Sequence, residues 1–354
     1  MKRNFRVSST AIVILLMILV LLIKGNNALS EIMGKDNPSP SYTSSKVPQD
    51  PSGESVTITG HPSTVSPEAS DNAAYDPDIA PLSFLPSDLR LYSSHAVLLS
   101  LDTKEMLLDK GSKDKIYPAS LTKIMTVITV IENLDNLDRK VLLSGEIYDT
   151  LSAENSSMAG FLPKEEVSAI DLLYGAMLPS GGECCMSLAE YIAGSESDFV
   201  QLMNDKAYEL GMDQTHFTNT TGLHDSEHYT TVWDLAVLLQ YSLKNDTFRQ
   251  IFTSSRYTSS PTNLHPDGIT MYSTLFKKLP NVKTENVKLL GGKTGYTSKA
   301  GLCLASLAEI GGKEYIMISA GAEGNHATEQ YNITDALSVY SRISGKQFAD
   351  KARP

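Results

Sequence analysis

The feature that most constrains this chain is a lysine placed inside a strongly apolar helical segment. Ser120 and Lys123 lie three residues apart, and an almost unbroken apolar run follows them as far as Ile131. That pattern predicts a helix buried on nearly every side. Three residues make almost one helical turn, so the two side chains are expected on one face. Because a buried charged lysine is unfavourable, the pair predicts a neutral amine that activates a serine nucleophile.

This pair alone does not identify a catalytic site. A second serine-x-x-lysine, Ser112 to Lys115, lies in the polar run 111–115, which is expected at the surface. Short motifs of this kind recur by chance, and a single match is usually structural. What distinguishes the Ser120 pair is its place on a buried helix, together with two further motifs downstream.

The two further motifs lie on different predicted elements. Ser180 is in the tight loop Leu-Pro-Ser-Gly-Gly between two segments with helical spacing. Lys293-Thr294-Gly295 lies on a predicted strand, and this tripeptide is rarer by chance than serine-x-x-lysine. The three motifs, in this order, form the set that characterises β-lactamases and penicillin-binding proteins.

The order of the predicted elements indicates the fold class. Strands are predicted at both ends of the folded region, with a block of helices between them, so an α+β fold is expected. It would have one antiparallel sheet made from both chain ends and a helical subdomain that covers the sheet. The predicted strands are 95–101, 106–109, 288–297, 302–309 and 314–320, and the predicted helices besides the Ser120 helix are 170–178, 184–193, 198–210, 233–243 and 332–343.

The N-terminus carries an export signal. Basic residues precede an unbroken apolar run from Ala11 to Ile23. As a helix this run is about 20 Å long, against a membrane core of about 30 Å, which leaves open a cleaved signal peptide or a short anchor. Ala28-Leu29-Ser30 is a passable cleavage site. The interpretation favoured is a single uncleaved anchor that holds an extracytoplasmic domain at the cell membrane; cleavage would instead give a secreted protein.

Four regions are predicted along the chain. Residues 1–30 form the signal-anchor, and residues 31–81 are so rich in Ser and Pro that they cannot bury a core and form a disordered tether. Residues 82–345 form the catalytic domain. Residues 346–354 are a short tail.

The composition limits which kinds of partner and cofactor the chain is expected to bind. The net charge of −11 and a pI near 5.1 argue against nucleic acid or an anionic membrane surface. The cysteines, Cys184, Cys185 and Cys303, have neither zinc spacing nor an even count, so they are expected to be small packing residues. His224 and His228 flank a polar loop segment, and neither a metal nor another cofactor is expected.

The chain resembles the D-alanyl-D-alanine carboxypeptidases, the low-molecular-mass penicillin-binding proteins of serine peptidase family S11. The resemblance extends from about Leu82 to about Gly345. Besides the three motifs, it includes segments 155–160, 171–175 and 221–231. It implies a penicillin-binding-protein fold and an enzyme that removes the terminal D-alanine from peptidoglycan stem peptides ending in D-Ala-D-Ala. β-Lactams would be covalent inhibitors.

The resemblance also implies a role for each matching residue. Ser120 would attack the carbonyl between the two D-alanines and Lys123 would take its proton. Burial and the charge of Lys293 would both lower the pKa of Lys123. Ser180 would relay a proton to the departing D-alanine.

Substrate binding is assigned to the strand motif in the same way. Lys293 and Thr294 would hold the substrate's free carboxylate, while Gly295 would let the substrate lie against the strand. The backbone N–H groups of Ser120 and Tyr296 would form the oxyanion hole.

Three departures from the family pattern stand out. Gly182 occupies a position where the family usually has asparagine; the absent amide would have contacted Lys123 and the substrate, and Glu183 is a candidate to compensate. A C-terminal β domain with a trailing anchor is not expected, and the N-terminal segment would provide the anchoring. Some family members place a late arginine near the substrate carboxylate, but this chain has no arginine between Ala300 and Ser341.

Two other functions remain open. The first is a β-lactamase-like hydrolase that uses the same serine with fast deacylation. The second is a tethered cell-wall binding protein whose site is crippled by Gly182. Within the carboxypeptidase interpretation, wall maturation and a penicillin-sensitive, VanY-type role in glycopeptide resistance are both compatible with the sequence.

Overall fold

The computed structural model describes residues 89–279 and 287–351. The predicted anchor, tether and cleavage site all lie outside these residues. Among the described residues, no helix is both long enough and apolar enough to cross a membrane.

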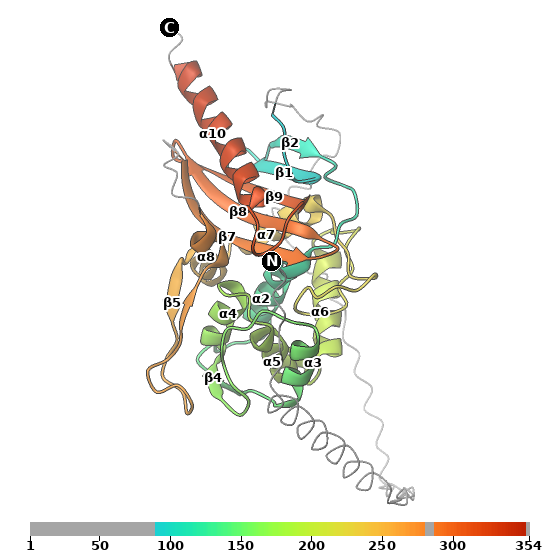
Figure 1. Cartoon of the computed structure of the whole chain (residues 1–354), viewed down its shortest axis with the longest axis vertical. Coiled ribbons are helices and arrows are strands. Elements are labelled where there is room, and N and C mark those ends of the chain that lie inside the picture. The colour runs from blue at the N-terminus through green and yellow to red at the C-terminus, as the bar shows by residue number, and fades with distance from the viewer. Residues whose placement is uncertain (1–88, 280–286, 352–354) are drawn as a thin grey trace, which may run out of the picture. The chain divides into compact units, whose positions relative to one another are not determined.

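A five-stranded antiparallel sheet forms the centre of the described chain (Figure 1). Its order, β2-β1-β9-β8-β7, places strands from the start of the domain beside strands from its end, as the sequence predicted. Strand β7 lies at one edge of this sheet. The strands are β1 (His95–Ser100), β2 (Met106–Lys110), β7 (Val287–Thr297), β8 (Gly301–Ile310) and β9 (Lys313–Ala322).

Both faces of the sheet are covered, which explains why its strands are apolar at successive positions. In β1, Val97 and Leu99 belong to the main core under the helical block. Ala96 and Leu98 point the other way, into a smaller cluster beneath α10 (Tyr331–Lys351). Figure 1 shows α10 across the sheet and the helical block on the other side.

The helical block surrounds α2, the helix that follows Ser120. Residues Thr122 to Val130 of α2 are all buried, as the apolar pattern predicted. Side chains of Ser168, Ser195, Thr231 and Asn245 cap the helices that follow them by accepting hydrogen bonds from backbone N–H groups. The helices are α2 (Thr122–Asn133), α3 (Glu146–Ala153), α4 (Ala169–Met177), α5 (Gly182–Ala193), α6 (Glu196–Glu209), α7 (Val232–Ser242), α8 (Asp246–Thr253) and α9 (Thr274–Lys278).

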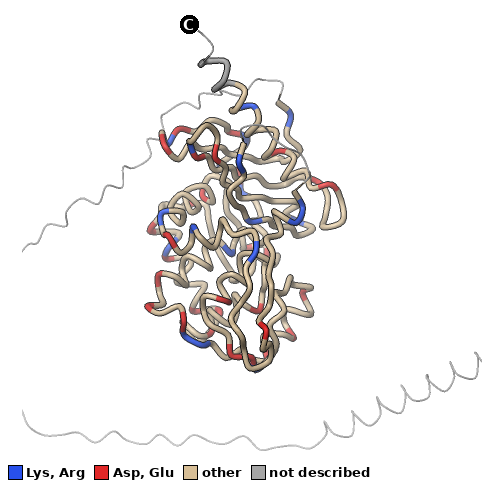
Figure 2. Tube along the Cα trace, turned by 90° about the vertical axis from the view of Figure 1, so that its left-hand side faces the viewer, with Lys and Arg blue, Asp and Glu red and all other residues tan. Residues whose placement is uncertain are grey.

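The three cysteines are buried and free, so their prediction as packing residues is confirmed. Burial raises the pKa of Cys185 to about 11 and that of Cys303 to about 12. Figure 2 shows Lys and Arg interspersed with Asp and Glu along the described chain, not gathered on one basic face.

Several details of the predicted fold were wrong. The last helix does not end at Ile343 but continues through Gly345 to Lys351, because the residues after this glycine are ordinary helix formers. Ser112 is buried, although its polar neighbours suggested a surface position. Elements that were not predicted are short: α3, α8, α9 and the strands β3 (Lys140–Leu142), β4 (Glu166–Ser168), β5 (Arg256–Thr258) and β6 (Thr270–Tyr272).

Candidate active site

The predicted nucleophile lies on a strained turn. Ser120 is in a 3-10 turn, Ala119–Leu121, that runs directly into α2. Ala119 has φ +47°, a left-handed conformation that is unfavourable for alanine. Ser120 is only half-buried, so the turn presents it at the end of the buried helix.

Lys123 reaches the Ser120 hydroxyl, as the spacing predicted. Its Nζ lies 3.3 Å from Ser120 Oγ and donates to the backbone carbonyl of Thr221 at 2.6 Å. The lysine is only 2% exposed. A neutral amine in this position can accept the serine proton, which is the arrangement that nucleophile activation requires.

Ser180 and Lys293 form the second pair of the site. Lys293 Nζ donates to Ser180 Oγ at 2.9 Å and to the carbonyl of Thr294 at 2.8 Å. Ser180 sits between α4 and α5 with φ +72°, a second strained residue. The fold thus joins the inter-helix loop to the edge strand β7 and brings the second and third motifs into contact.

The pKa values of both lysines are lowered from the ordinary value, and burial is the main cause. The positive charges of Lys123 and Lys293 repel each other, which further lowers the pKa of Lys293. Desolvation is the main cause that favours the neutral form of Lys123.

Gly295 has a packing role that the sequence did not predict. A Cβ at this position would lie 3.0 Å from the backbone nitrogen of Ser120 and 3.2 Å from Ala119 Cβ. A side chain here would therefore crowd the nucleophile turn. Gly295 therefore allows β7 to pack closely on the Ser120 turn.

Thr294 and Tyr296 lie on either side of Gly295 in β7. The Thr294 hydroxyl is 2.7 Å from the hydroxyl of Thr274 in α9. The Tyr296 ring packs edge-on against His326, with ring centroids 5.0 Å apart. Because β7 is an edge strand of the sheet, its outer side is suited to receive an extended peptide.

Gly182 is the first residue of α5, and the space for a side chain there is already filled. A Cβ at 182 would lie 2.4 Å from Ser156 Oγ and 2.7 Å from Leu151 Cδ2. The Gly182 N–H donates to the carbonyl of Ser157 at 2.7 Å. Ser156 and Leu151 therefore occupy the place that a side chain at 182 would take.

Glu183 holds segment 156–160 through its buried carboxyl group. Its Oε1 accepts from the N–H groups of Ala159 and Gly160 at 2.7 and 2.8 Å. The carboxyl is fully buried, and burial raises its pKa. The Glu183 side chain therefore acts on the loop beside the site.

Restoring the usual residue by Gly182→Asn is expected to reduce stability, because the new side chain collides with Ser156 and Leu151. Overpacking of this kind costs about 1–3 kcal/mol. Adding Ser156→Gly removes the nearer obstacle and is expected to recover part of the loss. Denaturant unfolding of both variants, with Ser156→Gly alone as control, measures the effect. Full stability in Gly182→Asn would contradict this packing.

Sequence reasoning missed the part played by the loop from Thr215 to Thr231. Its Thr220 and Thr221 carbonyls accept hydrogen bonds from Thr126 and Lys123 of α2. The segment resembled the family, but nothing in its composition showed that it would pack on the catalytic helix. Loop 215–231 is therefore a support of the site.

His228 links this loop to the nucleophile turn. Its Nδ1 accepts the N–H of Thr218 at 3.0 Å, so in the neutral ring the proton lies on Nε2. That nitrogen is 2.8 Å from Thr122 Oγ1, which donates to the carbonyl of Ala119 at 2.9 Å. Both ring nitrogens are thus occupied, which leaves neither free for a metal.

Acid is expected to destabilise the protein through His228. The side chain is 2% exposed, and burial lowers its pKa from 6.5 to about 4. Between these values the unfolded chain binds a proton that the folded chain does not, so stability falls as pH drops through this window. The total is about 3 kcal/mol, at about 1.4 kcal/mol per unit of pH.

Unfolding free energies measured from pH 7 to pH 4 check this. His228→Gln is expected to flatten the pH dependence by about that amount, relative to its own value at pH 7. His216→Gln, a change at an exposed histidine of the same loop, serves as control. An equal slope in His228→Gln and the unaltered protein would rule the assignment out.

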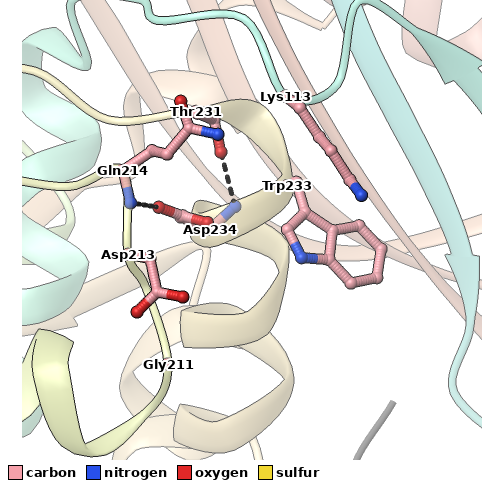
Figure 3. Close-up of a pocket in the computed structure, with 7 residues that line it drawn as sticks. All are labelled: Lys113, Gly211, Asp213, Gln214, Thr231, Trp233 and Asp234. Atoms are coloured by element: carbon pink, nitrogen blue, oxygen red, sulfur yellow. Dashed lines mark hydrogen bonds between the residues drawn. The ribbon is translucent and has the colours of Figure 1, made fainter. Parts of the chain in front are cut away.

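A separate cavity of about 170 Å³ lies at the start of α7. Figure 3 shows the Asp234 carboxylate accepting from the N–H of Gln214 while the Thr231 side chain caps the helix. None of the predicted catalytic residues lines this cavity. It is lined by Lys113, Gly211, Asp213, Gln214, Thr231, Trp233 and Asp234.

Comparison with known proteins points to one family. Residues 83–324 match the family model for D-alanyl-D-alanine carboxypeptidase, Peptidase S11, and this range includes all three motifs. The chain is 35% identical over 241 residues to the D-alanyl-D-alanine carboxypeptidase DacF of Bacillus subtilis, covering 67% of this chain but only 59% of DacF. It is 30% identical over 257 residues to a D-alanyl-D-alanine endopeptidase of Pseudomonas aeruginosa, covering 70% and 76% of the two chains.

Comparison with solved structures supports the same family. The crystal structure of the Streptomyces K15 DD-transpeptidase superposes with a TM-score of 0.64 at 26% identity, covering 72% of this chain and 98% of that one. The likeness thus extends over nearly the whole of that enzyme. By sequence and by fold, the chain belongs to the D-alanyl-D-alanine carboxypeptidase family, serine peptidase family S11.

Proposed function

We propose that this protein is a serine D,D-carboxypeptidase that removes the terminal D-alanine from peptidoglycan stem pentapeptides through an acyl-enzyme. The observation that carries the proposal is the contact of a buried lysine with a half-exposed serine, Lys123 Nζ to Ser120 Oγ at 3.3 Å. The names of its relatives support the same substrate class.

Acylation would begin with Ser120. Its Oγ attacks the carbonyl carbon between the two D-alanines while Lys123 Nζ takes the hydroxyl proton. As the tetrahedral intermediate collapses, the C–N bond breaks and a proton passes to the departing amine. Ser180 is suited to relay that proton, because its hydroxyl lies 2.9 Å from Lys293 Nζ.

Deacylation returns the serine to its starting state. Water attacks the ester carbonyl, Lys123 accepts a proton from the water, and Ser120 leaves with a proton. The N–H groups of Ser120 and Tyr296 are proposed to stabilise the oxyanion in both halves of the reaction, at about 3 kcal/mol per donor.

Lys293 and Thr294 are proposed to select a free C-terminal carboxylate. Lys293 is fully buried and its pKa is lowered. An incoming carboxylate would favour its charged form, because an opposite charge close by offsets part of the cost of burial. Substrate binding and the charge of this lysine would therefore reinforce each other.

Two assays on the full-length protein test the proposal. It should be labelled by fluorescent penicillin and should release D-alanine from a peptide ending in D-Ala-D-Ala. Rapid penicillin turnover without release of D-alanine would indicate a β-lactamase-like hydrolase. Absence of both reactions would favour the second alternative, a tethered cell-wall binding protein.

The location and role are also proposals. An N-terminal anchor would place the enzyme on the outer side of the cell membrane, and fractionation of cells that express the full chain tests this. The phenotype of a deletion strain would distinguish a role in wall maturation from the trimming of pentapeptides in glycopeptide resistance. Only the second role predicts a changed glycopeptide sensitivity.

A further inference from the structure

A second hollow is lined by the end of α9, the start of α10 and the segment before α10, and none of its lining residues belongs to the three motifs. It has a volume of about 440 Å³. Two contacts connect it to the site: Thr274 of α9 bonds to Thr294, and His326 packs on Tyr296. It is lined by Lys278, His326, Ala327, Thr328, Glu329, Gln330, Ile333 and Thr334.

Lys278 is the notable residue of this hollow. It is the last residue of α9 and is partly buried, and its Nζ donates to the neutral side chain of Gln330 at 3.1 Å. None of the salt bridges in the described part of the chain includes it. Burial lowers its pKa. This ammonium group is therefore partly desolvated and, within the described residues, forms no salt bridge.

His326 connects the charge of this hollow to the catalytic site. Burial lowers the pKa of His326, and so do the positive charges of Lys278 and Lys293. The histidine thus lies within the field of both lysines. Glu329, the acidic residue that lines the hollow, is exposed to solvent and screened. The charge of Lys278 therefore favours the binding of an anion in the hollow.

We propose that Lys278, supported by Gln330 and His326, forms a subsite for the carboxylate of the leaving group. This inference rests on the proposed carboxypeptidase function. Lys293 Nζ already donates to Ser180 Oγ and to the Thr294 carbonyl. Lys278 lies four residues after Thr274, the hydrogen-bond partner of Thr294, and therefore on the same face of α9. A second cation on this face can supply a charge-assisted hydrogen bond in addition to that of Lys293.

The chain contains a matched control for this subsite. Lys277, the neighbouring residue of α9, is exposed, and its Nζ lies 5.0 Å from the centre of the Tyr272 ring. Lys277→Gln and Lys278→Gln remove the same charge from the same helix. A difference between these variants therefore reports on position and not on net charge.

The test compares a D-Ala-D-Ala peptide with its C-terminal amide. Lys278→Gln is expected to lower kcat/KM for the free acid about tenfold, mainly through KM, because one charge-assisted contact is lost. The kcat/KM of Lys278→Gln for the amide should change little. The kcat/KM of Lys277→Gln should change little for either substrate. A smaller loss for the free acid alone is expected in His326→Gln. Equal losses for acid and amide, or equal effects of the two lysine variants, would overturn the subsite.

A second measurement keeps this test separate from that of the proposed function. Acylation of Ser120 by benzylpenicillin is compared with acylation by its methyl ester, which lacks the negative charge. If the unaltered protein acylates but releases no D-alanine, the proposed function fails. The subsite is then supported if Lys278→Gln slows acylation by benzylpenicillin more than acylation by its methyl ester, and it is contradicted if both rates change equally. A protein that performs neither reaction contradicts both proposals.

Discussion

Ser120→Ala is expected to abolish covalent labelling by penicillin and to lower D-alanine release by a factor of about 10⁴ or more. The physical reason is that the substitution removes the atom that forms the acyl-enzyme, so no neighbouring group can restore the pathway. Because Ser120 is half-buried, the smaller alanine side chain fits without repacking. The folded protein should therefore remain intact.

Ser112→Ala is a suitable control, because Ser112 begins the other serine-x-x-lysine of the chain. Its hydroxyl is buried and has no hydrogen-bond partner within the described residues. Removing that hydroxyl is expected to leave labelling and release unchanged and to reduce stability little, since an unpaired buried polar group contributes nothing favourable. Labelling that survives in Ser120→Ala, or disappears in Ser112→Ala, would refute the assignment of the nucleophile.

Lys123→Met is expected to slow acylation about 10²- to 10⁴-fold, the usual contribution of a general base. It removes the amine at 3.3 Å from Ser120 Oγ and replaces it with an apolar side chain of similar length. Since the lysine is 2% exposed, this exchange removes a group that is expensive to bury. The exchange also removes the hydrogen bond to the Thr221 carbonyl, which offsets this gain. We therefore expect lower activity with little net change in thermal stability.

The pH profile distinguishes a base from a structural lysine. Burial lowers the pKa of Lys123, so the fraction of neutral amine rises with pH and acylation should rise with it until that pKa is passed. Lys123→Arg keeps a positive charge at every accessible pH and cannot act as the base. It should be slow at all pH values. Full activity in Lys123→Arg would exclude general-base catalysis by this residue.

The catalytic centre was partly predictable because some of its geometry is local. Ser120 and Lys123 meet through the three-residue spacing on one helical face, and the apolar run that follows required burial of that helix. The antiparallel sheet followed from the order of elements, since strands at both chain ends with helices between them have few other ways to bury their apolar faces.

Other contacts were predictable only through resemblance to a family. Ser180 and Lys293 are 113 positions apart in the sequence, yet their side chains meet at 2.9 Å. No periodicity connects residues at such a separation. Their contact depends on how the α4–α5 loop packs against β7, and the motif set anticipated it without explaining it.

The sequence by itself determined the nucleophile pair, the buried helix that carries it and the antiparallel sheet, because these depend on periodic patterns over short stretches. Only the tertiary structure decided what surrounds them. It filled the place of an absent side chain at Gly182 with Ser156, and it used Gly295 to pack a strand on the nucleophile turn. It also brought His228 beneath Thr122. These contacts are set by close packing between segments remote in sequence, which no local pattern encodes.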